Sequence, residues 1–340
     1  MTETATLVNH AFRLASRPVG MPKREDFDYG EAAVPELVDG QVLIKVLYLS
    51  LDPAMRGWMN DVRSYVPPVG IGEVMRAGGV GTVLRSNNPR FKVGDFVHGM
   101  LGIQEFAVSD GSDLYPVNPD MAPLPTYLGA LGMPGMTAYF GLLDICRPQA
   151  GETVVVSAAA GAVGSAVGQI ARIKGCRAIG IAGGEEKCQY LVEELGFDGA
   201  IDYKGGDVMA GLKEHCPQGV DIYFDNVGGE ILDAVLARLR RGARIALCGA
   251  ISQYNNTGPA RGPANYMSLL VYRATMKGFL VFDYLDRYPD AMKEMGAWMA
   301  SGKLKAKEDV VEGLETFPDT LLKLFRGENT GKLVLKVADA

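Results

Sequence analysis

One short segment constrains the fold of this chain more than any other. Residues 153–158 read Thr-Val-Val-Val-Ser-Ala, a β-branched apolar run, and the glycine-containing stretch 159–164 follows directly. Apolar side chains then recur at helical spacing through residues 163–171, and a second apolar run covers residues 177–182. Strand, glycine turn, helix and strand in this order are typical of a βαβ unit that binds a dinucleotide. Such a turn directs backbone N–H groups and a helix N-terminus at one point, which suits a pyrophosphate.

The glycines of the turn have separate predicted tasks. In the pattern G-x-G-x-x-G, Ala159 takes the first position, Gly161 the second and Gly164 the third. Gly161 is expected to let the backbone approach the pyrophosphate, and Gly164 to let the helix pack close to the sheet. Ala162 and Val163 lie between them and are counted with the cofactor-binding residues. Alanine at the first position loosens the match, so an α/β turn without a ligand is the alternative interpretation.

The end of the second apolar run indicates which dinucleotide is bound. An NAD site usually carries an Asp or Glu about 20 residues after the glycine turn, where it holds the ribose 2′-OH. Here residues 182–184 read Ala-Gly-Gly, and Lys187 follows one helical turn later. Lys187 is suited to pair with a 2′-phosphate as a point charge, although a solvated surface lysine is the alternative. We therefore expect NADPH/NADP rather than NADH/NAD.

Composition and charge limit the class of protein. A chain of 340 residues, 48% hydrophobic and 22% charged, is long enough for two domains with separate cores. A net charge of −6 without a basic cluster argues against a nucleic-acid partner. Residues 1–6 lack the basic and apolar regions of a signal peptide, and no apolar run approaches the ~18 residues that would span a membrane.

The cysteines indicate a reducing compartment. There are five, an odd number, and they are widely spaced without a CxxC pair. This spacing argues against a disulfide framework and against a structural zinc cluster. A cytoplasmic location is the simplest expectation.

Two regions with different patterns predict two domains. The first 128 residues contain strand-like runs broken by Gly and Pro, which favour a β-rich partial barrel. Prolines between residues 116 and 125 mark a loop into the next region. The expected strands of the first region are 41–49, 78–84, 96–100 and 104–108.

The second region alternates strands with helices. Six strands with intervening helices predict a doubly wound parallel sheet. After the opening βαβ unit we expect strands at 200–203, 221–224, 244–248 and 275–282, and helices at 185–195, 207–215 and 230–239. A helix at 286–301 is expected to lead back to the first domain, which a strand at 332–337 completes. The predicted domains are therefore 1–128 with 301–340, for catalysis and substrate, and 129–300, for NADP.

Four further segments accompany the glycine turn and carry a family resemblance. They are Ser-Leu-Asp-Pro-Ala-Met-Arg-Gly at 50–57, Phe-Asp-Asn-Val-Gly-Gly at 224–229, Cys-Gly-Ala-Ile-Ser-Gln-Tyr-Asn at 248–255 and Gly-Lys at 331–332. With them the chain resembles, over almost its whole length, zinc-independent medium-chain dehydrogenases/reductases of the prostaglandin reductase, plant alkenal double-bond reductase and bacterial curcumin reductase group. The resemblance implies a GroES-like catalytic domain and a Rossmann domain.

The histidine and cysteine inventory agrees with a metal-free member of that family. Related alcohol dehydrogenases hold a catalytic zinc through cysteine and a Gly-His-Glu segment. Near the corresponding place this chain has Gly72-Glu73-Val74, and its first 145 residues contain no cysteine. Because zinc needs three or four converging N, S or O ligands, no metal site is predicted.

The resemblance also implies an activity, the NADPH-dependent reduction of the C=C bond of α,β-unsaturated ketones and aldehydes. The expected substrate is a small apolar enone or enal. An NADPH quinone reductase and a non-catalytic NADP(H)-binding protein are the alternatives. Segments 251–255 and 52–57 favour the first reading over the quinone reductase, while Tyr254 and Lys187 weigh against a non-catalytic protein.

Tyr254 is the predicted catalytic residue. It follows the fifth strand, at the carboxyl end where open α/β sheets bind ligands, and the resemblance implies a tyrosine near the nicotinamide ribose and substrate. A phenol can donate a hydrogen bond to an enolate or relay a proton, although loop packing or cofactor binding alone is the alternative. Asn226 and Cys248 follow the fourth and fifth strands and are expected beside the cofactor, with Cys248 no nucleophile because no histidine lies near it in sequence.

The remaining expectations come from the resemblance. It implies that Tyr203 lies near the 2′-phosphate, that Asn329 approaches the nicotinamide and that Tyr65 lines the substrate pocket. It also implies a homodimer formed through the cofactor domain. The strand predicted at 275–282 is a plausible sheet edge for that pairing.

Overall fold

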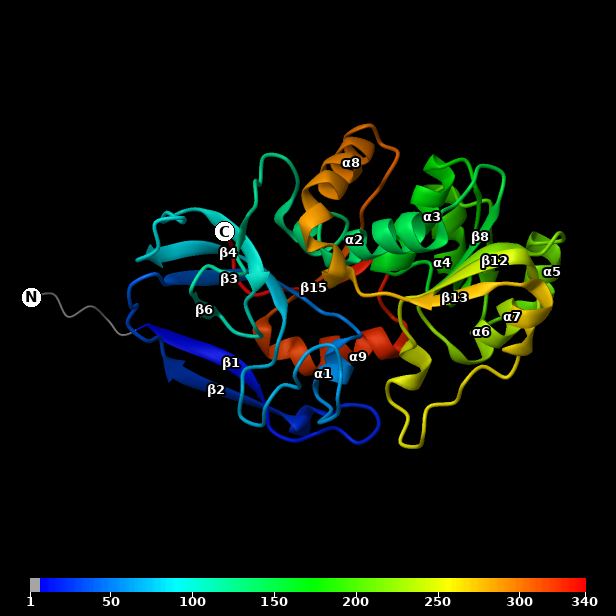
Figure 1. The fold of residues 1–340 in the computed structure, drawn as a ribbon. Helices are drawn as coiled ribbons and strands as arrows, with labels where there is room; N and C mark the ends of the chain where they lie inside the picture. The colour runs from blue at the N-terminus through cyan, green and yellow to red at the C-terminus, as the bar shows by residue number, and fades with distance from the viewer. Residues whose placement is uncertain (1–6) are drawn as a thin grey trace, which may run out of the picture. The chain divides into compact units, whose positions relative to one another are not determined.

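The computed structural model of the protein describes residues 7–340, so the expectation drawn from residues 1–6 lies outside the described part. The chain forms two compact units, each with its own core. The first unit combines the chain up to Leu128 with Glu308–Ala340, and the second consists of Gly129–Lys307 (Figure 1).

Six parallel strands form the sheet of the second unit, in the order β10-β9-β8-β11-β12-β13. The chain moves outward from β8 in one direction and then returns to add β11 on its other side, which is the doubly wound arrangement. The predicted fold class is therefore confirmed. The strands are β8 (Thr153–Ser157), β9 (Arg177–Ala182), β10 (Gly199–Asp202), β11 (Val220–Asp225), β12 (Leu239–Leu247) and β13 (Thr275–Gly278).

Helices cover both faces of this sheet. Successive side chains of a strand point to opposite faces, so Val154 and Val156 of β8 join the core under α2, α3 and α8, whereas Val155 joins the core under α5 and α6. Burial on both faces explains why β8 reads as an unbroken apolar run. The helices are α2 (Met133–Phe140), α3 (Ala162–Ile173), α4 (Glu185–Gln189), α5 (Val208–His215), α6 (Gly229–Leu236), α7 (Met267–Tyr272) and α8 (Tyr288–Ala300).

Two predicted boundaries in this unit are wrong. The helix expected at 230–239 ends at Leu236, and β12 already begins at Leu239, which pairs with Val220 and buries its side chain in the core. The strand expected at 275–282 ends at Gly278, and a 3-10 turn runs over Val281–Arg287. In both places apolar residues continue across the boundary, so the pattern alone does not mark the change of element.

The first unit is built mainly from β-strands, as predicted. Its seven-stranded sheet runs β14-β15-β3-β4-β5-β7, with β6 added beside β3, and β1 and β2 form a separate antiparallel pair. The four strands predicted there correspond to β3–β6, whereas β1, β2, β7 and β14 are not among the predicted strands. The elements are β1 (Val8–Leu14), β2 (Phe27–Ala33), β3 (Val42–Ser50), α1 (Met55–Trp58), β4 (Gly78–Ser86), β5 (Phe96–Met100), β6 (Phe106–Ser109), β7 (Tyr115–Pro116), β14 (Glu308–Glu312), α9 (Phe317–Arg326) and β15 (Lys332–Lys336).

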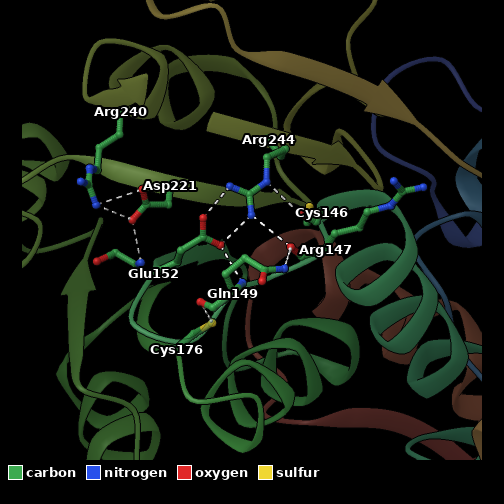
Figure 2. Close-up of polar contacts among 9 residues, drawn as sticks. Cys146, Arg147, Gln149, Glu152, Cys176, Asp221, Arg240 and Arg244 are labelled. Atoms are coloured by element: carbon green, nitrogen blue, oxygen red, sulfur yellow. Dashed lines mark hydrogen bonds and ion pairs between the residues drawn. The ribbon is translucent and has the colours of Figure 1, made fainter. Parts of the chain in front are cut away.

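A charged network fixes the amino ends of β8 and β11 in the second unit (Figure 2). The Arg244 guanidinium makes two hydrogen bonds to the Glu152 carboxylate, at 2.8 and 2.6 Å, and donates to the backbone carbonyls of Cys146 and Arg147. The hydrogen bond to Glu152 raises the pKa of Arg244 above its usual value. Asp221, at the start of β11, accepts a hydrogen bond from the Thr153 N–H. These pairs occupy the amino edge of the sheet, opposite the carboxyl edge where ligands bind in this fold.

A buried ion pair joins distant segments of the first unit. Lys332, at the start of β15, places its Nζ 2.8 Å from Asp52 Oδ1 and 2.7 Å from the Leu51 carbonyl. The Ser50 hydroxyl donates to the other Asp52 carboxylate oxygen. The side chains of Lys332 and Asp52 are only 3% and 9% exposed, so neither charge has water to replace its partner.

We predict that Lys332→Met destabilises the first unit by about 3–5 kcal/mol, because it leaves the Asp52 carboxylate buried without its cation. The matched control is Lys336→Met on the same strand, because the partners of Lys336, Glu312 and Asp339, are 77% and 90% exposed. This substitution should cost less than about 1 kcal/mol. Urea denaturation in a Trp298→Phe background lets Trp58, the other tryptophan of the chain, report this unit. Equal losses in the two variants would contradict the assignment.

Candidate functional site

The carboxyl ends of the parallel strands gather most of the predicted site residues in the second unit. Because the strands are parallel, the turns that follow them emerge at the same edge of the sheet. Gly161, Ala162, Val163 and Gly164 follow β8, Lys187 follows β9, Tyr203 follows β10, Asn226 follows β11, and Cys248 and Tyr254 follow β12.

The glycine turn is formed as a close contact between β8 and α3. Gly161 is the N-cap residue of α3, with extended backbone angles of φ −85° and ψ 176°. A Cβ on Gly164 would lie 2.7 Å from the Ala159 Cα and still closer to the Ala158 carbonyl oxygen, so only glycine lets the helix approach the strand end. The first N–H groups of α3 have no acceptor within the helix, and this turn therefore suits an anionic ligand.

A second turn, after β9, is shaped by two glycines and a carboxylate. Gly184 has φ +96°, and its N–H donates to Asp202 Oδ1 over 2.7 Å. That hydrogen bond is the main reason why the pKa of Asp202 lies below its usual value. A Cβ on Gly183 would lie 2.9 Å from the ring and hydroxyl of Tyr203, so this ring packs against the glycine backbone. Lys187 lies in the α4 helix that begins just after this turn, and it is half-buried.

Asp225, at the end of β11, organises the third turn. It is 1% exposed, and its Oδ1 accepts hydrogen bonds from the Tyr223 hydroxyl at 2.8 Å and from the N–H groups of Val227 and Gly228 at 3.0 and 2.9 Å. Its Oδ2 is buried and has no hydrogen-bond partner among residues 7–340. Burial raises the pKa of this carboxyl, against the lowering effect of the Gly228 and Val227 N–H bonds.

Asn226 ties the ends of β8 and β11 together. Its N–H donates to the Ser157 hydroxyl over 2.9 Å, and its Nδ2 donates to the Ser157 carbonyl over 2.8 Å. The side-chain amide is thus committed to the backbone of the neighbouring strand. The backbone carbonyl of Asn226 accepts a hydrogen bond from the Ile251 N–H over 3.2 Å, and this bond attaches the loop after β12.

That loop carries Tyr254 and Cys248. The Tyr254 hydroxyl accepts a hydrogen bond from the Ala250 N–H over 3.2 Å. Cys248 lies where β12 ends, and its N–H donates to the Asp225 carbonyl over 2.9 Å. Burial raises the pKa of the Cys248 thiol to about 12, so at neutral pH it is a thiol and not a nucleophilic thiolate.

The two other predicted site residues lie in the first unit. Tyr65 is 47% exposed, and its hydroxyl lies 3.4 Å from the Trp58 Nε1. Asn329 donates from its Nδ2 to the Gly331 carbonyl over 3.0 Å, directly before the buried Lys332. Both residues thus adjoin well-packed parts of their own unit.

Sequence reasoning missed Ser157, Asp202, Asp225 and Gly249. The carboxylates look like ordinary surface residues in the sequence, and only their positions at strand ends could have drawn attention to them. Among residues 7–340, no three His, Cys, Asp or Glu side chains are grouped so that they could hold a metal ion. Within the same range, no helix has the length and apolar character needed to cross a membrane.

Comparisons with known proteins match the chain over almost its full length. Residues 10–117 match a family described as the N-terminal domain of oxidoreductases, and residues 162–301 match one described as zinc-binding dehydrogenases. The NADPH-dependent curcumin reductase of Escherichia coli is 46% identical, covering 97% of each chain. The NADP⁺-dependent 2-alkenal reductase of Nicotiana tabacum is 44% identical, covering 94% of each. The crystal structure of CurA from Vibrio vulnificus in complex with NADPH superposes with a TM-score of 0.93 at 47% identity, covering 97% of this chain and all of that one.

Proposed function

The chain belongs to the zinc-independent group of the medium-chain dehydrogenase/reductase family, and from that premise we propose that it uses NADPH to reduce the C=C bond of α,β-unsaturated ketones and aldehydes. The observation that carries the proposal is the end-to-end match to NADPH-dependent reductases, one of which is named for 2-alkenals. The glycine turn and the Tyr254 loop, on one edge of the sheet, supply the corresponding parts in this chain.

The second unit has the features that an NADPH-binding domain needs. The close approach at Gly164 and the helix N-terminus behind Gly161 suit the pyrophosphate. The missing side chain at Gly183 lets the Tyr203 ring pack against this turn, and Lys187 brings a positive charge to it. We assign the 2′-phosphate to this turn. We assign Ala162, Val163, Asn226 and Cys248 to the cofactor side of this unit, and the family resemblance assigns Asn329 to the nicotinamide.

When bound, NADPH would supply the hydride. Addition of the hydride at the β-carbon moves the C=C electron pair toward the carbonyl and leaves negative charge on the carbonyl oxygen. Tyr254 donates its O–H to that oxygen and stabilises the enolate as it forms. The α-carbon then takes a proton from water or a hydroxyl, and the product is the saturated ketone or aldehyde. We assign Tyr65 to the binding of a small apolar substrate by family resemblance. Orientation of the bound substrate can account for about 7–11 kcal/mol of the barrier.

We expect the purified protein to oxidise NADPH in the presence of a simple α,β-unsaturated ketone and to release the saturated ketone. In Tyr254→Phe, kcat for the enone should fall ~10²–10³-fold while the Kd for NADPH stays nearly constant, because one donor to the developing charge is lost; a substituting water would reduce the effect. A parallel assay with a quinone tests the alternative reductase. Turnover of the quinone alone, or a loss confined to NADPH binding in Tyr254→Phe, would contradict the proposal.

Cofactor choice gives a second test. Lys187→Ala should weaken NADPH binding by about 1–3 kcal/mol and leave NADH binding almost unchanged, because only NADPH carries the 2′-phosphate that pairs with the lysine. Lys213→Ala, which removes an exposed lysine from α5, controls for the change in net charge. Fluorescence titration of each variant with both cofactors measures the effect. Equal losses for NADPH and NADH in Lys187→Ala would exclude this role.

A homodimer is also proposed for this chain. β13 is one of the two edge strands of the sheet, and the α7 helix that precedes it exposes Met267, Leu270 and Val271 at 52%, 69% and 58%. Figure 1 shows α7 and β13 together on the same side of the second unit. A second copy that pairs with β13 would cover this apolar surface and pair the exposed backbone groups of the edge.

A cytoplasmic location is proposed as well. The chain has five free thiols, three of them buried, and free thiols persist in a reducing compartment.

We predict that Leu270→Asp converts a dimer into a monomer, because it places a charge in the centre of the apolar surface. Val19→Asp, at a residue of the first unit that is 82% exposed, is the matched control and should leave the mass unchanged. Light scattering coupled to size-exclusion chromatography gives the mass directly. A wild-type protein that is already monomeric, or a Leu270→Asp variant that stays dimeric, would refute this interface.

A further inference from the structure

The hydroxyl of Tyr254 lies in a space that exists because residue 249 is glycine. A Cβ on Gly249 would be 2.8 Å from the Tyr254 hydroxyl oxygen, a distance that real Cβ atoms do not adopt. The other neighbours of such a Cβ lie at ordinary contact distances, 3.5 Å for the Asn226 carbonyl oxygen and 3.9 Å for the Tyr254 Cζ. The conflict would therefore fall on the hydroxyl group alone.

The backbone around this space holds the hydroxyl from the other side. The Ala250 N–H donates to the Tyr254 oxygen over 3.2 Å. The position of Ala250 is fixed in turn, because the Gly249 N–H donates to the Asp225 carbonyl over 3.1 Å and the Ile251 N–H donates to the Asn226 carbonyl over 3.2 Å. The phenol oxygen is thus located by a rigid strand end and not by its own flexible side chain.

The direction of this hydrogen bond also affects chemistry. An oxygen that accepts an N–H bond is polarised, and hydrogen bonds in a chain strengthen one another. Since the Ala250 N–H supplies the proton of this bond, the Tyr254 hydroxyl is the acceptor in it and its own proton is not used there. The same contact therefore both places the phenol and makes it a better donor to a developing oxyanion.

We propose that Gly249 is a positioning residue of the active site, whose missing side chain allows the Tyr254 hydroxyl to bind the Ala250 N–H in the orientation needed for donation to the substrate oxygen. This inference rests on the proposed function and adds a residue that acts through Tyr254. Gly249 itself needs no contact with substrate or cofactor. Its φ does not lie in the left-handed region, so alanine is compatible with the backbone there and any effect of Gly249→Ala arises from the side-chain conflict.

The test is a double-mutant cycle of Gly249→Ala and Tyr254→Phe. In the wild-type background Gly249→Ala should lower kcat for an enone at least ~10-fold, with the KM and the Kd for NADPH changed less than ~2-fold, because the hydroxyl is displaced while the cofactor turn is kept. In the Tyr254→Phe background, where no hydroxyl remains to be displaced, the same substitution should change kcat less than ~2-fold. Gly258→Ala, in the same connection and with nothing within 4 Å of its Cβ, is the control and should match wild type.

Each result decides between the interpretations. Additive losses in the cycle, or an unchanged kcat in Gly249→Ala, would overturn the proposal. A crystal structure of Gly249→Ala in which the Tyr254 oxygen still lies within 3.5 Å of the Ala250 nitrogen would overturn it independently of activity. If Gly249→Ala alone fails to fold, the double variant must fold and bind NADPH, since its conflict is removed; failure of both would refute the account. A wild-type protein without enone turnover would instead refute the proposed function and leave the structural comparison valid.

Discussion

The buried carboxyl of Asp225 is the interaction on which the rest of the site depends. One of its oxygens accepts hydrogen bonds from the Tyr223 hydroxyl and from two N–H groups of the turn that follows β11. Its backbone carbonyl accepts the N–H groups of Cys248 and Gly249, where β12 ends. A single residue thus fixes the positions of two neighbouring strand ends. Because a buried polar group without partners is costly, neither turn can move without leaving the Asp225 Oδ1 or its backbone carbonyl unsatisfied.

Close approaches to the backbone explain why glycines surround the site. At Gly164 the helix comes too close to the strand end for a Cβ, at Gly183 the Tyr203 ring occupies that space, and at Gly249 the Tyr254 hydroxyl does. Each glycine therefore allows a different group to approach the backbone: a helix, an aromatic ring and a phenol. The cofactor turn and the catalytic loop both rely on such close approaches, and this couples binding to chemistry at one edge of the sheet.

Much of the fold could be predicted from the sequence, because burial on both faces gives parallel strands such as residues 154–156 an unmistakable apolar run. The location of the glycine turn, Lys187 and Tyr254 at the carboxyl edge could be predicted for a related reason, since residues that follow such strands must lie there. The end of α6 at Leu236 could not, because apolar residues continue into β12 and only the pairing of Leu239 with Val220 decides the boundary. Asp202 and Asp225 were missed because their importance comes from hydrogen bonds to turns, and their positions at strand ends are the only sign of it in the sequence.

The central claim is that this protein delivers hydride to the β-carbon of an enone and leaves the carbonyl intact. The most direct measurement uses NADPH that carries deuterium at both C4 positions of the nicotinamide, with an enone in ordinary water and analysis of the product by NMR and mass spectrometry. The account predicts a saturated ketone with one deuterium at the β-carbon and a solvent proton at the α-carbon. An allylic alcohol with deuterium at the carbonyl carbon, or deuterium at the α-carbon, would contradict it.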